Sequence, residues 1–291
     1  MNPFSQSYSS DLEDERLIYL VLEGDKNALG QLLSNHQAFI YNVAWKMTGN
    51  SADAEDLSQE AMIKIVTNLS KFKFKSTFRT WAYRIVFNHF INDRKKAQNL
   101  FASNFEDLGN RLHATPDNPM DFDEKEEKRE LIREVRLQCL SGMLLCLTKE
   151  QRLIYIMGEI FAADHNIGSE IMNISKANFR MKLGKARKDL YHFMTHQCGL
   201  VDKANPCRCH KKVKAAVDQK MVDAKDLLNN RKEYVTFQSY LGEDADYLSE
   251  DADLRVAELQ QNLSFKKDFD KKSFIENILT DINWKSRLNL N

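Results

Sequence analysis

The sequence predicts an all-α protein: two small helical domains, a flexible acidic linker between them, and a helical C-terminal extension. Apolar residues recur with a period of about 3.6 through most of the chain, which is typical of amphipathic helices. The four prolines stand outside every periodic segment, at positions 3, 116, 119 and 206. Proline disrupts helix interiors, so these positions mark boundaries. We expect the parts to span residues 1–98, 99–130, 131–197 and 198–291.

Composition narrows the class of protein. The chain has 291 residues, room for roughly two domains. Lysine and arginine balance aspartate and glutamate at 42 each, so the net charge indicates no partner. No apolar run approaches the roughly 20 residues of a membrane helix, and the N-terminus lacks the basic-then-apolar order of a signal peptide. We therefore expect a cytoplasmic protein without a membrane partner. Five cysteines favour reduced thiols or a metal over a disulfide framework.

The first domain should contain at least three helices. Apolar residues follow the helical period from Leu12 to Met47. A second helix should start at Ser51 as its N-cap, with acidic residues in the first turn, where the helix dipole favours anions. A third should run from near Ser76 to about Lys96. The expected buried stripe of the second helix is Leu57, Ala61, Ile65, Val66 and Leu69, and the residues facing away from it are Asp56, Gln59, Glu60 and Lys64.

A basic and aromatic run, from Lys71 to Arg84, follows the second helix. Rings interleaved with cations form platforms on which single-stranded bases stack, each stack contributing roughly 1–3 kcal/mol. Phe78, Trp81 and Ile85 share one helical face, and we expect Trp81 to pack in the core. Base contact is expected instead at Lys73, Phe74, Lys75, Arg84 and Asn88.

Residues 99–130 differ in character from their neighbours. This segment contains Gly109, two prolines and an acidic run from Asp121 to Glu127. Such a composition predicts a flexible, negatively charged linker.

Helix-turn-helix spacing appears in the second domain. Thr148 and Gln151 have the spacing of a capping box and should open a helix that ends near Phe161. A short helix should follow from Asp164 to Met172, then a turn at Asn173, then a further helix capped by Ser175.

The helix after Ser175 carries cations and no acidic residue before Asp189. A cationic helix after a tight turn suits the DNA major groove, with its first residues reaching base edges and later ones holding phosphates. The alternative is a solvated basic face. The inward face should comprise Phe179, Leu183, Ala186 and Leu190, and the DNA-contacting set is Ser175, Lys176, Asn178, Arg180, Lys182, Lys185 and Arg187.

These motifs resemble a known family. Asp-Ala-Glu-Asp-Leu-x-Gln-Glu at 53–60, followed by Phe78-x-x-Trp81-x-Tyr83-Arg84-Ile85-x-x-Asn88, is similar to region 2 of bacterial sigma-70 factors of the extracytoplasmic-function group. The segment 147–190, ending in Arg180-x-x-Leu183-x-x-Ala186-Arg187-x-x-Leu190, is similar to their region 4. The resemblance covers residues from about 12 to 195.

The resemblance implies a sigma factor, which binds the RNA polymerase core and directs it to promoters. The loop from Lys71 to Ser76, with Arg84 and Asn88, would melt promoter DNA and capture a flipped base of the minus-ten element. The helix after Ser175 would read the minus-thirty-five element, and the acidic linker would thread through polymerase channels. Whether an anti-sigma factor is a further partner stays open. The residues implied to dock on the clamp helices of the largest polymerase subunit are Asp53, Asp56, Gln59 and Glu60.

The chain continues for about a hundred residues beyond the resemblance, and this tail opens with a cysteine cluster. Thiolates and imidazoles grouped in this way can form a tetrahedral zinc site, and the alternative is reduced cysteines around Pro206. Cys139 and Cys146 fall on the apolar face of a helix and should be buried as small hydrophobic residues. The candidate zinc ligands are Cys198, Cys207, Cys209 and His210.

Two other classes of protein compete with the sigma factor. One is a one-component helix-turn-helix regulator that senses a ligand or metal through the tail, and the other is an adaptor without a role at DNA. An acidic face at 53–60 beside a basic-aromatic loop favours the sigma factor, because a repressor needs only the cationic half. We find no phosphate-cradling glycine loop and no nucleophile-base spacing, so we expect no enzyme and no required cofactor.

Overall fold

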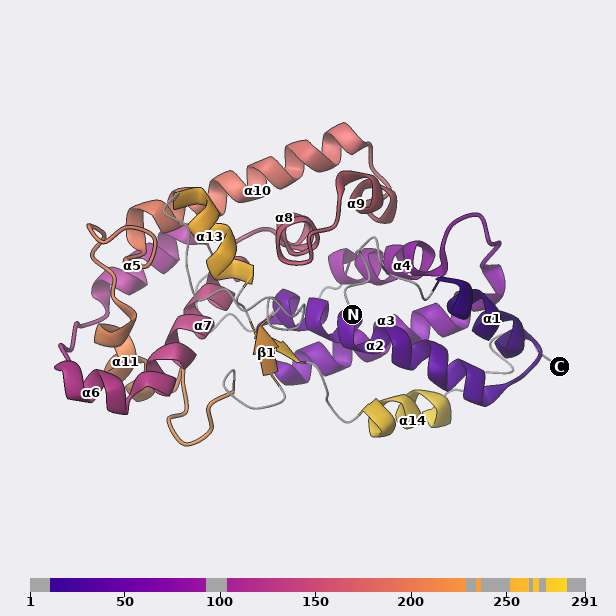
Figure 1. Cartoon of the computed structure of the whole chain (residues 1–291), viewed down its shortest axis with the longest axis horizontal. Helices are drawn as coiled ribbons and strands as arrows, with labels where there is room; N and C mark the ends of the chain where they lie inside the picture. Colours follow the sequence, from indigo (N-terminus) through magenta and orange to yellow (C-terminus); the bar gives the residue numbers. More distant parts are fainter. Residues whose placement is uncertain are drawn as a thin grey trace. The chain divides into compact units, whose positions relative to one another are not determined.

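The computed structural model describes residues 11–92, 104–228, 234–236, 252–261, 264–266 and 271–281, and Figure 1 traces the chain. The chain folds into two compact units, each assembled from separated stretches of sequence. Unit 1 comprises residues 1–97, 156–182 and 268–291, and unit 2 comprises residues 98–155 and 183–267. The helix-turn-helix is thus grouped with the N-terminal helices, and the predicted domain limits stay a prediction.

Helices form both units, as predicted. Unit 1 contains α1 (Asp11–Leu22), α2 (Lys26–Thr48), α3 (Ser51–Asn68), the short 3-10 helix η1 (Leu69–Lys71), α4 (Phe78–Asn92), the π-helical η2 (Ile156–Ile160), α9 (His165–Met172), the start of α10 (Lys176–Gln197) and α14 (Lys271–Asp281). Unit 2 contains α5 (Phe105–Ala114), α6 (Phe122–Glu127), α7 (Arg129–Leu145), α8 (Lys149–Tyr155), the rest of α10, α11 (Cys209–Asp218) and α13 (Ala252–Gln261). A short antiparallel ribbon, β1 (Tyr234–Thr236) with β2 (Ser264–Lys266), completes unit 2.

The α2–α3 hairpin is set by its capping residues. Asp25 caps α2 by accepting from the amides of Asn27 and Ala28. Gly49 ends α2 with φ 78°, a left-handed conformation that glycine adopts at little cost. The expected N-cap of α3 was wrong by one residue. Asn50, not Ser51, has the extended backbone of a cap, and its side chain accepts from the amide of Asp53 at 2.8 Å.

A buried polar network joins three helices of unit 1. The His36 ring on α2 lies 3.0 Å from the Asp14 carboxylate on α1 and 2.9 Å from the Tyr83 hydroxyl on α4. All three side chains are buried. A buried imidazole with a partner on each nitrogen fixes how these helices pack, since an unpaired buried polar group is costly. Around it, the predicted stripe of α3 is buried as expected.

The C-terminal helix α14 packs on α2 and α3 within unit 1. Phe274, Ile275 and Ile278 are its buried residues. A Cβ atom added at Gly30 of α2 would lie 3.6 Å from a methyl group of Leu279, so α14 approaches α2 closely at this glycine. The part of the predicted C-terminal extension that forms α14 therefore adds a layer to unit 1.

The segment predicted as a flexible linker is instead helical in residues 105–114 and 122–127. Asn104 caps α5, and Asp121 with Glu124 forms a complete capping box on α6. Leu108 is buried, and the amide of Asn118 donates to the carbonyl of Lys211 at 2.9 Å. The prolines lie between the two helices, where they interrupt neither. Composition predicted flexibility, but capping and contact with α11 order this segment.

The turn from α7 to α8 is held by a buried arginine. The Thr148–Gln151 capping box is present, and α8 continues as a π-helix to Ile160, which confirms the predicted helix end. The Arg152 guanidinium donates to the carbonyls of Leu144, Leu145 and Leu147 at 2.8–3.0 Å. Leu144 and Leu145 are the last two residues of α7, and Leu147 follows in the turn, so Arg152 caps the C-terminal end of this helix. Burial lowers the pKa of Arg152 to about 10, and the group stays charged at neutral pH.

Candidate nucleic-acid and polymerase interface

The helix-turn-helix forms with the predicted limits. Asp164 caps α9, Asn173 adopts a left-handed conformation with φ 53°, and the Ser175 hydroxyl accepts from the amide of Asn178 at 3.1 Å. Gly168 meets the ring of Phe179 so closely that an added Cβ would overlap it. The two helices therefore cross at contact distance, and glycine at position 168 permits the crossing.

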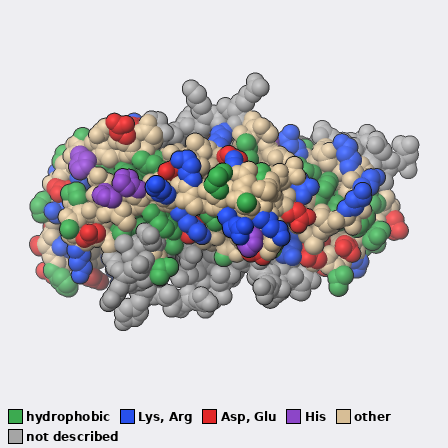
Figure 2. All heavy atoms as spheres, turned by 90° about the horizontal axis from the view of Figure 1, so that it is seen from above, with side chains coloured by type: hydrophobic (Ala, Val, Ile, Leu, Met, Phe, Trp, Pro, Cys, Tyr) green, Lys and Arg blue, Asp and Glu red, His purple; other side chains and the backbone are tan. Residues whose placement is uncertain are grey.

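Helix α10 separates an apolar face from a basic one. Its predicted inward residues are all buried. The predicted cations lie on the opposite side, with Lys182 half-buried and Lys185 paired to Asp189 at 3.3 Å. Figure 2 looks onto the side that carries α10 and shows lysine and arginine side chains along it. The exposed cations of α10 are Lys176, Arg180, Lys185, Arg187 and Lys188.

Met181 was missed by sequence reasoning. Its side chain is 67% exposed among the cations of α10, although methionine is usually buried. An exposed apolar side chain on a groove-facing helix can contact thymine methyl groups. The sequence could have indicated this exposure, because position 181 does not belong to the repeating series of buried residues along α10.

The four predicted polymerase-binding residues lie outside the buried stripe of α3. Asp56 is exposed, whereas Asp53, Gln59 and Glu60 are half-buried. Asp53 is bonded to the Asn50 side chain, and the Glu60 carboxylate lies 3.3 Å from the ring of His89 on α4. Asp56 therefore offers the most accessible charge on this face.

The predicted base-capture loop carries an aromatic pair. The Phe74 ring stacks on Tyr19 of α1, with centroids 5.0 Å apart and planes within 9° of parallel. Tyr19 is 58% exposed, so the pair presents a ring surface to solvent. Sequence reasoning missed Tyr19 because its partner is 55 positions away. Lys73 and Lys75 are exposed on either side, and Ser76 is half-buried.

A groove of about 440 Å³ lies between α3 and α4. Trp81, expected in the core, is half-buried instead, because the rings of Phe72 and Phe78 cover part of it and the rest lines the groove. A tryptophan face beside lysines and amides is typical of nucleotide-binding surfaces. The other residues lining the groove are Lys64, Asn68, Lys71, Ile85, Asn88, His89 and Asn92.

Arg84 lies apart from this groove. Its guanidinium donates to the carbonyl of Glu170, at the end of α9, with distances of 2.9 and 3.2 Å. A cation at a helix C-terminus interacts favourably with the helix dipole. Arg84 thus joins α4 to the helix-turn-helix in this structure, and α4 and α9 pack together within unit 1.

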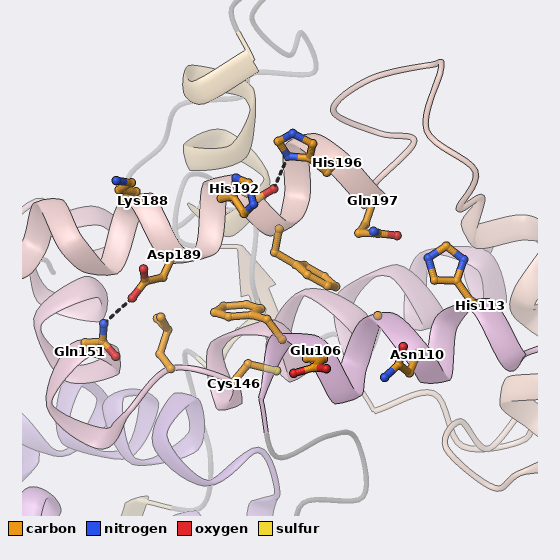
Figure 3. Close-up of a pocket in the computed structure, with 14 residues that line it drawn as sticks. Glu106, Asn110, His113, Cys146, Gln151, Lys188, Asp189, His192, His196 and Gln197 are labelled. Carbon is orange, nitrogen blue, oxygen red and sulfur yellow. Dashed lines mark hydrogen bonds between the residues drawn. The ribbon is translucent and has the colours of Figure 1, made fainter.

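A second cleft, of about 650 Å³, lies in unit 2 between α5, α8 and α10. Figure 3 shows Gln151 and Asp189 pointing toward each other, and their hydrogen bond is 2.7 Å long. His192 and His196, one helical turn apart on α10, have ring centroids 4.4 Å apart, and His113 of α5 lines the same cleft. No sequence motif predicted this cleft, because its walls come from three helices.

The candidate zinc ligands also lie in unit 2. Cys198 and Cys207 are joined by a backbone β-bridge, and Cys209 begins α11. Burial raises the pKa of Cys209 to about 12, and all five cysteines are free. Among the residues that the structure describes, no three histidine, cysteine, aspartate or glutamate side chains are arranged to hold a metal ion.

Comparison with known proteins shows which family the N-terminal part of the chain is similar to. The family model Sigma-70 region 2 matches residues 32–100, which contain α3, the basic loop and α4. The chain is 34% identical over 82 residues to the ECF RNA polymerase sigma factor SigW of Bacillus subtilis, covering 28% of this chain and 44% of that one. Over this segment the chain is similar to the sigma-70 family, and the relatives it matches include sigma factors of the extracytoplasmic-function group. The predicted polymerase-binding residues and region 2 DNA-binding residues all fall inside the matched segment.

Other relatives extend the match beyond region 2. The RNA polymerase sigma factor YlaC of Bacillus subtilis is 26% identical over 171 residues, covering 58% of this chain and 94% of that one. The ECF RNA polymerase sigma-E factor of Haemophilus influenzae is 30% identical over 122 residues, covering 38% and 64%. A solved structure titled "Structure of CnrH in complex with the cytosolic domain of CnrY" is 19% identical, with a TM-score of 0.42, covering 62% of this chain and 96% of that one.

The match covers less than half the length of the first of these relatives, SigW. The activity and partners of the whole protein are therefore a proposal. Within the described residues, no helix has the length and apolar character needed to cross a bilayer.

Proposed function

We propose that this protein is a promoter-specificity subunit, which binds the RNA polymerase core and directs it to promoters for transcription initiation. The observation that carries the proposal is the juxtaposition within region 2: the acidic face of α3 lies on the same helix pair as the cationic, tryptophan-lined groove. A protein that brings a large enzyme to nucleic acid needs both surfaces.

The roles divide by surface. The acidic face of α3 docks on the clamp helices of the largest polymerase subunit. The loop and groove, including Tyr19, Phe74 and Trp81, hold an unstacked base of the minus-ten element, and α10 reads the minus-thirty-five element. The role is one of binding and positioning, without catalysis. Its partners place it in the cytoplasm, and an anti-sigma factor would compete for the same surfaces.

The decisive experiment is in vitro transcription with core polymerase. Core enzyme with this protein should start transcripts at defined sites on a library of genomic fragments, and core enzyme alone should not. A one-component regulator would bind duplex DNA but leave core enzyme unable to start specifically. Specific DNA binding without specific initiation would therefore refute the proposal.

Charge reversal tests the polymerase surface. Asp56→Lys should weaken core binding at least ten-fold, because juxtaposed like charges at an interface cost several kcal/mol. Glu55→Lys is the matched control: Glu55 is also exposed on α3 but is turned about 100° around the helix. Fluorescence titration with core enzyme measures both. If the two variants bind core polymerase with equal affinity, the Asp56 face of α3 is not the polymerase-binding surface.

A further inference from the structure

Four of the five cysteines gather in unit 2 from three separated segments. Cys139 of α7, Cys207 and Cys209 line one cavity of about 60 Å³. Cys198, at the end of α10, is joined to Cys207 by the β-bridge. Cys139 is 59 to 70 positions from the other three, so the cluster forms because α7 packs on α11. His210 is half-buried, and it is not among the described residues that line the cavity.

The loop between Cys198 and Cys209 is built around these sulfur atoms. The amides of Leu200 and Val201 donate to the sulfur of Cys198. The amide of Gly199 donates to the Cys207 carbonyl at 3.1 Å, and an added Cβ at Gly199 would overlap Arg208 and that carbonyl. Asn205 closes the loop by donating to the carbonyls of Thr195 and Cys198 at 2.9 and 3.0 Å. Burial raises the pKa of the Cys198 thiol, and the two amides oppose that rise by favouring the anionic form of the sulfur.

Cations surround the cluster. Arg136 of α7 donates to the sulfur of Cys209, and its Nε atom is buried without a hydrogen-bond partner among the described residues. Arg208 interacts with Cys198 and Cys207, and Lys212 with Cys207. Four thiolates around a divalent cation carry a net charge of about −2 by simple charge counting, which these cations would compensate. Two of them also have other partners: Arg208 donates to the carbonyls of Asn205 and Cys207, and Lys212 is paired with Asp117 at 3.0 Å.

We propose that Cys139, Cys198, Cys207 and Cys209 form a tetrathiolate site for a thiophilic divalent cation, with zinc as the best match. Tetrahedral coordination by four sulfurs is typical of structural zinc, with Zn–S distances of about 2.3 Å. No three of these thiols are arranged around a common point in this structure, so metal binding requires the cluster to rearrange. The ion would clasp α7, the end of α10 and α11 together. In this proposed site Cys139 takes the place of His210, which was the fourth ligand predicted from sequence spacing.

Metal content and thiol protection test the site without any mutation. Full-length protein, purified without an affinity tag and reduced, should bind one zinc ion per chain when zinc is added. Alkylation followed by peptide mass spectrometry should then show that zinc protects four cysteines from alkylation and that a chelator makes them reactive again. Cys146 should react at the same rate in both states. Less than half an equivalent of bound zinc, or chelator-independent alkylation of all five cysteines, would overturn the proposal, as would a Cys198–Cys207 disulfide in protein isolated with thiols blocked.

Variants assign the ligands. Cys139→Ser should lower zinc affinity at least ten-fold in competition with a chromogenic chelator, whereas His210→Ala and Cys146→Ser should bind as the wild type does. Cobalt(II) adds a second readout, because its sulfur-to-metal charge-transfer absorption scales with the number of thiolates and should fall by about a quarter in Cys139→Ser. Loss of affinity in His210→Ala with retention in Cys139→Ser would refute this ligand set. Because the assay needs no polymerase, its result is independent of the proposed function.

Discussion

At the scale of single residues, Lys46 is a cation enclosed by unit 1. Its side chain is buried in α2, and burial lowers its pKa from 10.5 to about 7. Because the folded-state pKa lies below the unfolded value, the unfolded chain binds more protons between these two pH values, and stability rises with pH across that window. The destabilisation is fully present below pH 7 and absent above pH 10.5.

Lys46→Met should therefore stabilise unit 1 by roughly 2–4 kcal/mol at pH 6, from about 1.4 kcal/mol per pKa unit reduced for relaxation around the buried group. The difference from the wild type should shrink steadily toward pH 10. Urea denaturation at several pH values measures it. Lys26→Met, at an exposed position of the same helix, is the control and should change little. Parallel stability curves for wild type and Lys46→Met would show that Lys46 does not titrate in this window.

At the scale of elements, α14 is the layer whose attachment depends on a few apolar side chains. Ile278 is 1% exposed where α14 packs on α2 and α3. Ile278→Asp would bury a charge without a designed partner, which costs more than a helix of 11 residues can compensate. We expect α14 to detach while α1–α4 stay folded, because their core is formed by their own residues and the His36 network.

Limited proteolysis measures this detachment. Cleavage within residues 271–281 should become at least ten-fold faster in Ile278→Asp. Asn277→Asp places the same charge at an exposed neighbouring position and should be cleaved like the wild type. If the two variants are cleaved equally fast, α14 is not held by this apolar contact.

At the scale of the whole molecule, the contact between α4 and α9 is incompatible with the proposed binding of both promoter elements at once. Arg84 bonds to the end of α9, so the groove and the helix-turn-helix are held together within unit 1. The minus-ten and minus-thirty-five elements are named for positions about 25 base pairs apart, which is roughly 85 Å of duplex at 3.4 Å per base pair. If the proposed roles are right, α9 must leave α4 when both elements are bound.

Energy transfer between two dyes tests this separation. Labels at the exposed positions Lys26 and Asn166 should show high transfer in the free protein and low transfer in the polymerase–promoter complex. A control pair at Lys26 and Ala52, both within the α2–α3 hairpin, should not change. High transfer from the first pair in a complex that has opened the promoter would mean that α4 and α9 stay together, and the two-element assignment would be wrong.

Local sequence patterns were enough to predict the helices of the helix-turn-helix and the acidic and basic faces. The caps at Asp164 and Ser175 and the inward stripe of α10 depend on residues three or four positions apart, and the sequence therefore encodes them locally. The region 2 motif likewise lies within one short stretch. The segment after Asn99 was misread because composition reports flexibility only when nothing packs on the chain, and α11 supplies that packing.

Contacts between residues that are far apart in the sequence became known only from the tertiary structure. The stacking of Tyr19 on Phe74, the bond from Arg84 to α9 and the cavity that Cys139 shares with Cys209 join positions 55 to 86 residues apart. No local period records such pairings, because they follow from how whole helices pack once their apolar faces are buried. The sequence therefore determined what each helix presents, and the packing of the helices determined what each presented residue contacts.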